Sequence, residues 1–461
     1  ASIRPMHVWG RGGRDAGVST ALRIRELDPA IEVSVMLRDG FPNYSICGLP
    51  FLISGETTGS QSLAHRTSAD LQAAGLQVRP HCDVIAVNPS DQRVDLDDGD
   101  SVAYDRLILA TGARSRRPEL EGVDLPGVFT LRWMGDALRM LTVLEEQQPR
   151  RALIVGGGYI GLEMADALHT RGLEVTLIEH NPAVLRTVHS SFGDVIQNEL
   201  CARGITVRSG LRLAAIRQSH QALEAELNDG QRISTDLVLL AVGAVPANEL
   251  AASAGGSPGA GGAMVVDRQM RTGVASVWAA GDGVETYHRL LGRNVYQPLG
   301  TNSHKQGRIA GENAIGGNRL YPGTLGTQVV KVFDRVVART GLRDQEARLE
   351  GLDPLTVPFE CSSHKAYYPG ADRLHFRITG DRTDGRLLGA QLMGPWGQEV
   401  SKRLDTFANA LFHGMRVDAI SDLDLSYTPP LSSPWDPVQM ASQAWEAQSR
   451  TLASATIPSN S

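Results

Sequence analysis

Apolar and polar positions along the chain follow the same plan in two separate regions. Each region has an apolar strand, a glycine-rich turn, a helical pattern and a second strand, in that order. These parts are residues 6–9, 10–17, 18–27 and 32–36 in the first region, and 152–155, 156–161, 162–171 and 174–178 in the second. Parts of these lengths and in this order form a βαβ unit, which implies a parallel sheet. The sequence therefore predicts an α/β protein with two Rossmann-like dinucleotide-binding domains.

The region from about residue 326 to 446 has a different pattern. Its expected elements are strands at 328–338, 374–378 and 387–392, followed by an amphipathic helix at 398–413. Strands followed by a helix favour an α+β unit, so we expect a third domain here. The tail from residue 447 onward is small and polar, and we expect it to be flexible.

Composition and charge narrow the class of protein. A chain of 461 residues is too long for one hydrophobic core, in agreement with two or three domains. The net charge of −6 argues against a nucleic-acid-binding surface. No apolar run reaches the roughly 18 residues that a membrane span needs, and the first ten residues lack the pattern of a secretory signal. We therefore expect a cytoplasmic protein without nucleic-acid or membrane partners.

Four cysteines, Cys47, Cys82, Cys201 and Cys361, are scattered along the chain without CxxC or CxH spacing. They are too sparse for a disulfide framework and are wrongly spaced for zinc, so no metal site is expected. Reduced thiols, one or two of them reactive, are the better interpretation.

The turn GGGYIGLE at 156–163 is the strongest local motif. Gly156 permits a tight turn, Gly158 lets the backbone approach a pyrophosphate, and Gly161 lets the helix pack on the strand. The acidic residue that should follow about 20 positions later, at the end of the next strand, is Glu179, which suits a ribose 2′-hydroxyl. His180 and Asn181 follow it, with no adjacent arginine for a 2′-phosphate. The motif favours NADH and leaves NADPH possible.

The N-terminal glycine turn is less regular. Gly12, Gly13 and Gly17 align with the motif, but Arg14 stands where the second glycine belongs, and Leu37 stands where a ribose-binding acid is expected. By itself this turn is either a dinucleotide site or a structural turn. A compensation in which Arg14 reaches the pyrophosphate, and Arg38 or Asp39 the ribose, is a hypothesis.

Three further segments resemble one family. Residues 104–113 (YDRLILATGA) resemble the ATG strand of flavoprotein disulfide reductases, and 277–283 (VWAAGDG) resemble their second flavin motif. Residues 43–51 (NYSICGLPF) resemble the single-cysteine motif of coenzyme A–disulfide reductases and NADH oxidases. The order of the segments matches from about residue 5 to 445. The chain therefore resembles the single-cysteine branch of the pyridine nucleotide-disulfide oxidoreductase family.

This resemblance implies FAD and NAD(P)H as cofactors and a homodimer as the assembly. The implied domains are an FAD-binding domain in two segments (1–115 and 246–325), an NAD(P)H-binding domain (116–245), a C-terminal α+β dimerisation domain (326–446) and a flexible tail (447–461). The implied cofactor-binding residues are Gly12, Gly13, Gly17, Thr111, Gly112, Gly281 and Asp282 for FAD, and Gly156, Gly158, Tyr159, Ile160, Gly161, Glu163, Glu179 and Gly243 around the nicotinamide nucleotide. Among them, Asp282 resembles the aspartate that holds the ribityl chain, and Tyr159 the gate that moves when the nicotinamide docks.

Cys47 is the expected redox centre. Gly48, Leu49 and Pro50 follow it, and proline favours the first turn of a helix. A sulfur at a helix N-terminus should have a lowered pKa. Buried apolar packing is the alternative for a lone cysteine, but the surrounding motif favours the redox role. The CxxxxC spacing is absent, so the partner sulfur must come from a substrate or an oxidant.

The resemblance also implies roles for tyrosines and for a basic residue. Tyr367 or Tyr368, and Tyr427, match tyrosines that reach the active cysteine from the other subunit; aromatic packing at a dimer interface is the alternative. Arg25 matches a residue that binds the ADP part of coenzyme A, and Asn43 is a second substrate-binding candidate. Ile46 and Asn43 depart from the usual residues there, which puts coenzyme A itself in doubt.

Three functions are compatible with these features. The favoured one is NADH-dependent reduction of a low-molecular-weight disulfide, persulfide or polysulfide through Cys47. The second is an NADH oxidase or peroxidase in which Cys47 cycles through sulfenic acid. Asp15 stands where the peroxidase branch has a histidine, which argues against efficient peroxide chemistry. The third, electron transfer to a partner protein, is the weakest because such relatives lack the cysteine motif.

Overall fold

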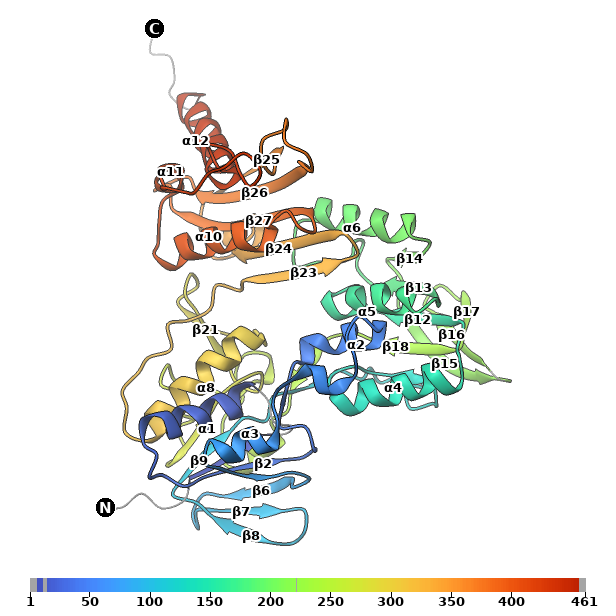
Figure 1. Ribbon diagram of the computed structural model, residues 1–461, viewed down its shortest axis with the longest axis vertical. Helices are drawn as coiled ribbons and strands as arrows, with labels where there is room; N and C mark the ends of the chain where they lie inside the picture. Colours follow the sequence, from blue (N-terminus) through green and yellow to red (C-terminus); the bar gives the residue numbers. More distant parts are fainter. Residues whose placement is uncertain (1–5, 11–14, 221, 456–461) are drawn as a thin grey trace.

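Two parallel sheets and one antiparallel sheet organise the chain into three units (Figure 1). The computed structural model describes residues 6–10, 15–220 and 222–455. In Figure 1 the N-terminal unit lies at the bottom, the middle unit to its right and the C-terminal unit above both. The predicted α/β class with an added α+β unit is confirmed.

The N-terminal unit is built on a five-stranded parallel sheet. Its strands, in spatial order, are β20 (Val277–Ala279), β9 (Arg106–Leu109), β1 (Met6–Gly10), β2 (Val33–Leu37) and β5 (Leu76–Arg79). Helices α1 (Asp15–Leu27) and α8 (Gly300–Ala314) pack against each other. A Cβ atom at Gly307 would overlap the backbone of Ala16, so this contact needs glycine. The close approach of these helices brings together two segments that are far apart in the sequence.

Smaller elements complete this unit. The short helices are η1 (Ile46–Gly48), α2 (Leu49–Ser54), η2 (Ser60–Leu63), α3 (Ser68–Ala73), α7 (Glu249–Ser253) and η3 (Ala260–Gly262). Three small antiparallel sheets are formed by β3 (Asn43–Tyr44) and β4 (Ala64–Arg66), by β6 (Val84–Asn88), β7 (Arg93–Leu96) and β8 (Ser101–Ala103), and by β21 (Thr286–His288) and β22 (Arg293–Val295).

The middle unit repeats the parallel design. Its sheet has the order β11 (Val128–Phe129), β18 (Leu237–Leu240), β12 (Arg151–Val155), β13 (Glu174–Glu179) and β14 (Thr206–Ser209). Its other elements are α4 (Met134–Glu146), α5 (Tyr159–Thr170), α6 (Ser190–Ala202) and the antiparallel strands β15 (Leu213–Ser219), β16 (Ala222–Leu227) and β17 (Arg232–Thr235). The chain enters this unit through β10 (Ala113–Ser115) and leaves it through β19 (Ala244–Pro246), and these two strands pair antiparallel. Both predicted βαβ units are thus present.

The C-terminal unit is an antiparallel sheet with helices. Its strands, in spatial order, are β23 (Gln328–Val332), β24 (Arg335–Gly341), β27 (Leu387–Pro395), β26 (Arg373–Asp381) and β25 (Pro354–Ser362), and its helices are α9 (Asp344–Leu349), α10 (Val400–Phe412), α11 (Val417–Ser421) and α12 (Pro437–Ala455). The single strand expected at 328–338 is wrong, because a turn at Phe333, with a φ of 49°, divides it into β23 and β24. Apolar residues flank the turn on both sides, and only Asp334 and Arg335 separate them, so the two strands resemble one.

The expected flexible tail is also wrong in its first half, since α12 continues to Ala455. Trp445 is buried, and its Nε1 donates to the carbonyl of Leu355 at 2.8 Å, which fixes α12 on the sheet. Arg450 pairs with Glu446 at 2.6 Å one turn earlier and supports the polar end of the helix. Within the described ranges, neither α12 nor another helix is both long and apolar enough to cross a membrane.

Candidate active site

Cys47 lies in the short turn η1, between β3 and α2. The Gly48 amide donates to Ser45 Oγ at 3.1 Å, which closes the turn. Pro50 stands in the first turn of α2, where its fixed φ is favourable. The motif therefore forms a defined loop that leaves the Cys47 side chain exposed.

Helix α2 fixes this loop against the middle unit, although it belongs to the N-terminal unit in sequence. Leu49, Leu52 and Ile53 are buried in one core with residues of α4 and α5. In addition, Arg171 Nε donates to the carbonyl of Ile53 at 2.6 Å. Figure 1 shows α2 beside α5 and α4, apart from the sheet of its own unit. Cys47 consequently lies at the junction of the two nucleotide-fold units.

The surroundings of Cys47 raise the pKa of its thiol. Burial is the largest cause, because the protein around the sulfur disfavours the charged thiolate even though part of the side chain is exposed. The carboxylates of Glu163, Asp15 and Asp282 also raise this pKa, whereas the Arg132 guanidinium lowers it. The prediction of a lowered pKa is therefore wrong. Helix α2 has only six residues, and its dipole is outweighed.

A cleft opens beside Ile46, the residue before Cys47. It is lined by Asp15, Ala16, Ile46, Ala110, Gly112, Ala280, Gly281, Asp282, Gly300 and Ser303. Asp282 accepts hydrogen bonds from Arg132 Nη2 at 2.5 Å and from Ser303 Oγ at 3.0 Å. The Gly281 amide donates to Gln306 Oε1 at 3.0 Å. Asp282 and Gly281 are thus held in place at the cleft.

The cleft has the features of a site for a large polar cofactor. Gly112, with a φ of +68°, faces open space where a Cβ atom would lie. Tyr296 Oη and Gln297 Oε1 are buried and lack a hydrogen-bond partner within the described residues, and Tyr296 lies in electrostatic range of Asp282. Thr111, beside Gly112, is buried. These polar groups and this open backbone fit FAD.

Part of the predicted FAD site cannot be placed in this way. Gly12, Gly13 and Arg14 lie outside the described residues, and Gly17 is buried in α1. Leu37 is fully buried, so the ribose-binding position on β2 is filled by an apolar side chain. Arg38 lies 3.4 Å from Asp83, so its guanidinium already has a partner.

The second glycine turn joins β12 to α5. A Cβ atom at Gly161 would overlap the carbonyl oxygen of Gly156, whereas one at Gly158 would meet nothing within 4 Å. Glu179 is buried and accepts from the amides of Gly157 and Asn181, each at 2.7 Å. Gly158 therefore presents open backbone at the start of a helix, as a phosphate site requires. Gly243, with a φ of +101°, likewise borders open space.

Tyr159, the expected gate, is held by one contact within its own unit and one with the C-terminal unit. Its hydroxyl donates to Gln328 Oε1 at 2.5 Å, at the start of β23, and accepts from Thr187 Oγ1 at 3.1 Å. Burial raises the pKa of Tyr159, so the phenol stays neutral. Ile160, the next residue, is exposed.

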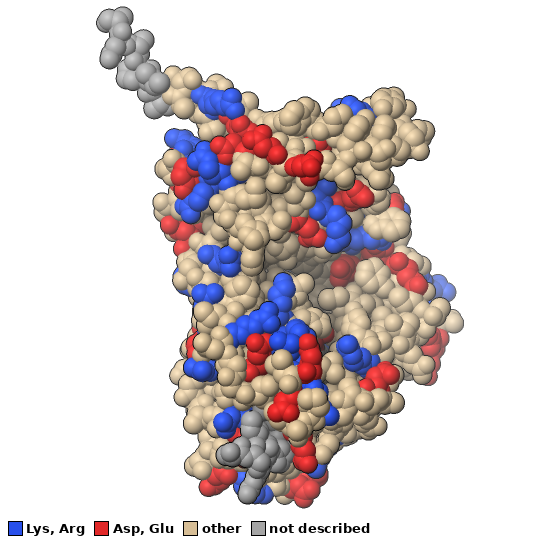
Figure 2. Space-filling view, turned by 60° about the vertical axis from the view of Figure 1, so that its left-hand side comes forward, with Lys and Arg blue, Asp and Glu red and all other residues tan. Residues whose placement is uncertain are grey.

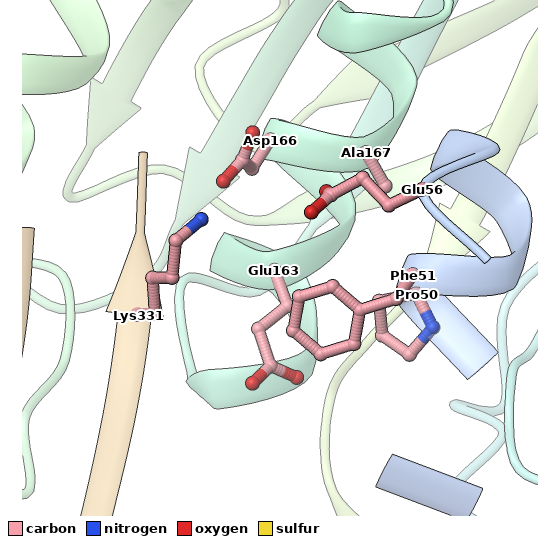
Figure 3. Close-up of a pocket in the computed structure, with 7 residues that line it drawn as sticks. All are labelled: Pro50, Phe51, Glu56, Glu163, Asp166, Ala167 and Lys331. Atoms are coloured by element: carbon pink, nitrogen blue, oxygen red, sulfur yellow. The ribbon is translucent and has the colours of Figure 1, made fainter. Parts of the chain in front are cut away.

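Glu163 lies one turn further along α5, in a pocket beside α2 (Figure 3). Pro50 and Phe51 line the pocket from α2, and Asp166 and Lys331 line it from α5 and β23. Figure 3 shows the Glu163 carboxylate below the Phe51 ring and directed away from Lys331. Burial, and then Asp166, raises the pKa of Glu163 to about 7. Glu163 is thus a carboxyl group that can change protonation near neutral pH beside the Cys47 loop.

The three candidate tyrosines cluster in the C-terminal unit. Tyr367 and Tyr427 lie close together, and after burial the interaction with Tyr367 is the next cause that raises the pKa of Tyr427. All three are exposed, Tyr367 at 74% and Tyr368 and Tyr427 at 43%. Tyr427 follows α11, and Tyr367 and Tyr368 lie between β25 and β26. These elements are at the top of Figure 1, whereas α2 lies much lower. Within one chain, the tyrosines and Cys47 are not brought together.

The two substrate-binding candidates have structural contacts. Arg25 donates to the carbonyls of Pro29, Ile31 and Ala74, which occupies its guanidinium at the end of α1. Asn43 is only 3% exposed, on the short strand β3. The Arg25 guanidinium therefore holds the chain locally, and Asn43 is buried; the substrate roles of both residues stay predictions.

Several site residues were not predicted from the sequence: Arg132, Tyr296, Ser303, His304 and Gln328. Apart from Tyr296, each acts through a partner elsewhere along the chain, as in the pair of Arg132 with Asp282, 150 residues apart. No local pattern around Arg132 or Gln328 marks them as part of the site.

An exposed cysteine between two nucleotide-fold units is the arrangement expected of a two-cofactor oxidoreductase. Residues 12–307 match the pyridine nucleotide-disulphide oxidoreductase family, and residues 327–437 match its dimerisation domain. The chain belongs to this family, and it is an oxidoreductase that uses FAD and NAD(P)H.

Individual relatives cover nearly the whole chain. The NAD(P)H coenzyme A polysulfide/persulfide reductase of Pyrococcus horikoshii is 34% identical over 93% of this chain and 95% of its own length. The NADH oxidase of Methanocaldococcus jannaschii is 30% identical over 94% of this chain and 97% of its own. The NAD-dependent persulfide reductase of A. fulgidus has a similar structure, with a TM-score of 0.92 and 32% identity over 97% of this chain and 84% of its own.

Proposed function

We propose that this chain reduces a low-molecular-weight disulfide, persulfide or polysulfide with NAD(P)H, through FAD and Cys47. The observation that carries the proposal is the position of Cys47, exposed at the junction between the FAD cleft and the α5 nucleotide turn. All four cysteines of the chain are free, so the second sulfur comes from the substrate. The relatives named as persulfide reductases support the same substrate class.

The proposed division of labour follows the three units. We propose residues 1–115 and 246–325 for FAD binding, 116–245 for NAD(P)H binding and 326–446 for dimerisation. When bound, FAD carries two electrons from the nicotinamide to sulfur at Cys47. Asp282 and Gly281 would hold the FAD, and Gly158 and Glu179 the nucleotide, with NADH preferred.

The chemistry at sulfur needs little more than Cys47. Its thiolate attacks one sulfur of the substrate, which forms a mixed disulfide and releases the first thiolate. Two electrons then release the second thiolate and restore the Cys47 thiolate. Overall, one NAD(P)H and one proton convert one disulfide into two thiols.

An anionic substrate suits the rim of the cleft. Arg66 on β4 and Lys305 on α8 are exposed and form no ion pair within the part of the chain that the structure describes. Arg66 lies in electrostatic range of His304, which places β4 beside this end of α8. Figure 2 shows Lys and Arg side chains gathered at the lower edge of a hollow in the molecule. We propose that this basic rim, and not Arg25, attracts the substrate.

A homodimer completes the site in this proposal. The C-terminal dimerisation domain would present the exposed Tyr427 and Tyr367 to Cys47 of the other subunit. There a tyrosine hydroxyl would protonate the departing thiolate. We place the enzyme in the cytoplasm, because free cysteines are typical of a reducing compartment.

The test is the substitution Cys47→Ser. It should keep the reduction of bound flavin by NADH and abolish disulfide turnover, whereas Cys201→Ser, at another exposed cysteine, should leave both unchanged. Stopped-flow absorbance and a steady-state panel of disulfides and polysulfide measure the two steps. Disulfide turnover that survives in Cys47→Ser would overturn the proposal.

The second candidate is an NADH oxidase that cycles Cys47 through sulfenic acid, as the oxidase relative suggests. The same panel with O2 and peroxide as acceptors separates the two functions. Faster turnover with O2 than with every disulfide or polysulfide would favour the oxidase.

A further inference from the structure

An ion pair of Asp15 and His304 lies beside Cys47 and has no role in the reaction described so far. Asp15 begins α1 and His304 lies in the first half of α8. His304 Nε2 is 3.2 Å from Asp15 Oδ1, and its Nδ1 is 2.9 Å from Ser19 Oγ. Both ring nitrogens therefore have fixed partners on α1, while half of the His304 side chain remains exposed.

Asp15 connects this pair to the reactive sulfur. It lines the same cleft as Ile46, the residue before Cys47, and its side chain is only 19% exposed. Asp15 is one of three carboxylates in electrostatic range of Cys47, with Glu163 and Asp282. Arg132, which also acts on the sulfur, is already bound to Asp282. An uncompensated charge on Asp15 would therefore add directly to the negative field at Cys47.

We propose that His304 is a positioning residue that acts through Asp15. Its positive charge offsets the Asp15 carboxylate and so helps Cys47 to form the thiolate. The inference deepens the proposed function, on which it rests, since it concerns control of the same sulfur.

The expected pH dependence follows from the groups that face His304. Asp15 raises the pKa of His304, first through its hydrogen bond, and Arg66 on β4 lowers it. His304 keeps its proton until the pH rises through this raised pKa. Above it the imidazole is neutral, and the Asp15 charge opposes ionisation of Cys47. The Cys47 thiolate should therefore accumulate over a broader pH range than a single thiol titration gives.

Alkylation of Cys47 by iodoacetamide measures this effect without NADH or substrate. The rate is followed by mass spectrometry of the Cys47 peptide in the purified flavoprotein, from pH 6 to pH 9. Cys201, which is also exposed, is the reference thiol in the same molecule. The variants are His304→Asn, His304→Gln, Asp15→Asn and the double variant Asp15→Asn with His304→Asn. His413→Asn, at an exposed histidine that follows α10, is the matched control.

Both His304 variants should slow Cys47 alkylation near pH 7 by about threefold to tenfold, which is up to about one pKa unit. Asp15→Asn should accelerate it. In that background, the His304 substitution should lose most of its effect, because His304 without Asp15 is largely neutral above its usual pKa. His413→Asn and the Cys201 rates should not change.

Three results would overturn the proposal. The first is an unchanged Cys47 rate in both His304 variants. The second is a normal rate in His304→Gln alone, because glutamine keeps a hydrogen-bond donor without a charge. The third is equal slowing at Cys201, which would indicate a general change of structure. Failure of the proposed function would instead appear as disulfide turnover in Cys47→Ser, a separate measurement.

Discussion

Two glycines of the α5 turn should respond in opposite ways to the same substitution. A methyl group at Gly158 would enter open space, and the backbone there, with a φ of −82°, accepts alanine. A methyl group at Gly161 would overlap the carbonyl oxygen of Gly156, which is backbone and cannot move aside. Gly158→Ala should therefore weaken nucleotide binding, whereas Gly161→Ala should lower the stability of the fold.

The magnitudes follow from these contacts. Gly158→Ala should change the free energy of unfolding by no more than about 0.5 kcal/mol, as for an open site. If the methyl displaces one hydrogen bond between the backbone and a phosphate, binding loses about 1.5–3 kcal/mol, or roughly tenfold to a hundredfold in Kd. Gly161→Ala should cost about 1–3 kcal/mol of stability or more, because it overpacks the contact of the helix with the turn.

The two effects are measured separately. Thermal unfolding of the flavoprotein without nucleotide gives the stability, and calorimetric titration with NAD⁺ gives the affinity. An equal loss of melting temperature in both variants would refute the distinction between the two glycines. Wild-type affinity in Gly158→Ala would show that the nucleotide does not approach this position.

Three further changes test other parts of the site. Arg132→Leu leaves Asp282 without its buried partner, which costs about 3–5 kcal/mol of stability at the flavin site. The variant should therefore release its yellow cofactor on dialysis, and full retention of flavin absorbance would contradict this. Gln328→Leu removes a hydrogen bond that contributes about 1 kcal/mol to holding Tyr159 in place. Because the gate then moves more easily, NADH should reduce the flavin at about fivefold lower concentration in stopped-flow traces. The pKa of Glu163 is raised to about 7, so ionisation costs stability between the usual value of 4.5 and 7; Glu163→Gln should be more stable than the wild type above pH 7, by up to about 3 kcal/mol, with no difference below pH 4 in melting curves.

The two nucleotide folds could be predicted because their signals are local. A strand, a glycine turn and a helix follow one another within about 30 residues, and periodicity records each of them. The C-terminal unit was harder. The turn at Phe333 has only Asp334 to mark it, without glycine, asparagine or proline, and β25 was missed altogether. Such features depend on tertiary contacts, as does the end of α12, which Trp445 fixes on the sheet.

The site was predictable only where one short segment carries it. The Cys47 loop and the segment from Gly156 to Glu179 are such segments, and both have the turn and helix that their sequences predict. The partners of these segments were not visible. Arg132 meets Asp282 and Gln328 meets Tyr159 only after the three units have packed together. A side chain's own type gives no information about which distant residue it will face.

The wrong prediction for the Cys47 pKa shows how this limit affects function. The sequence offers a cysteine just before a helix, and a helix dipole lowers a thiol pKa. The structure surrounds the same sulfur with carboxylates from three elements: Asp15 on α1, Glu163 on α5 and Asp282 after β20. Burial of the sulfur is the largest cause of the raised pKa, and these carboxylates add to it, so together they outweigh the partial charge of one short helix. Cations that neutralise these carboxylates therefore favour the Cys47 thiolate, and Arg132 on Asp282 is the first of them.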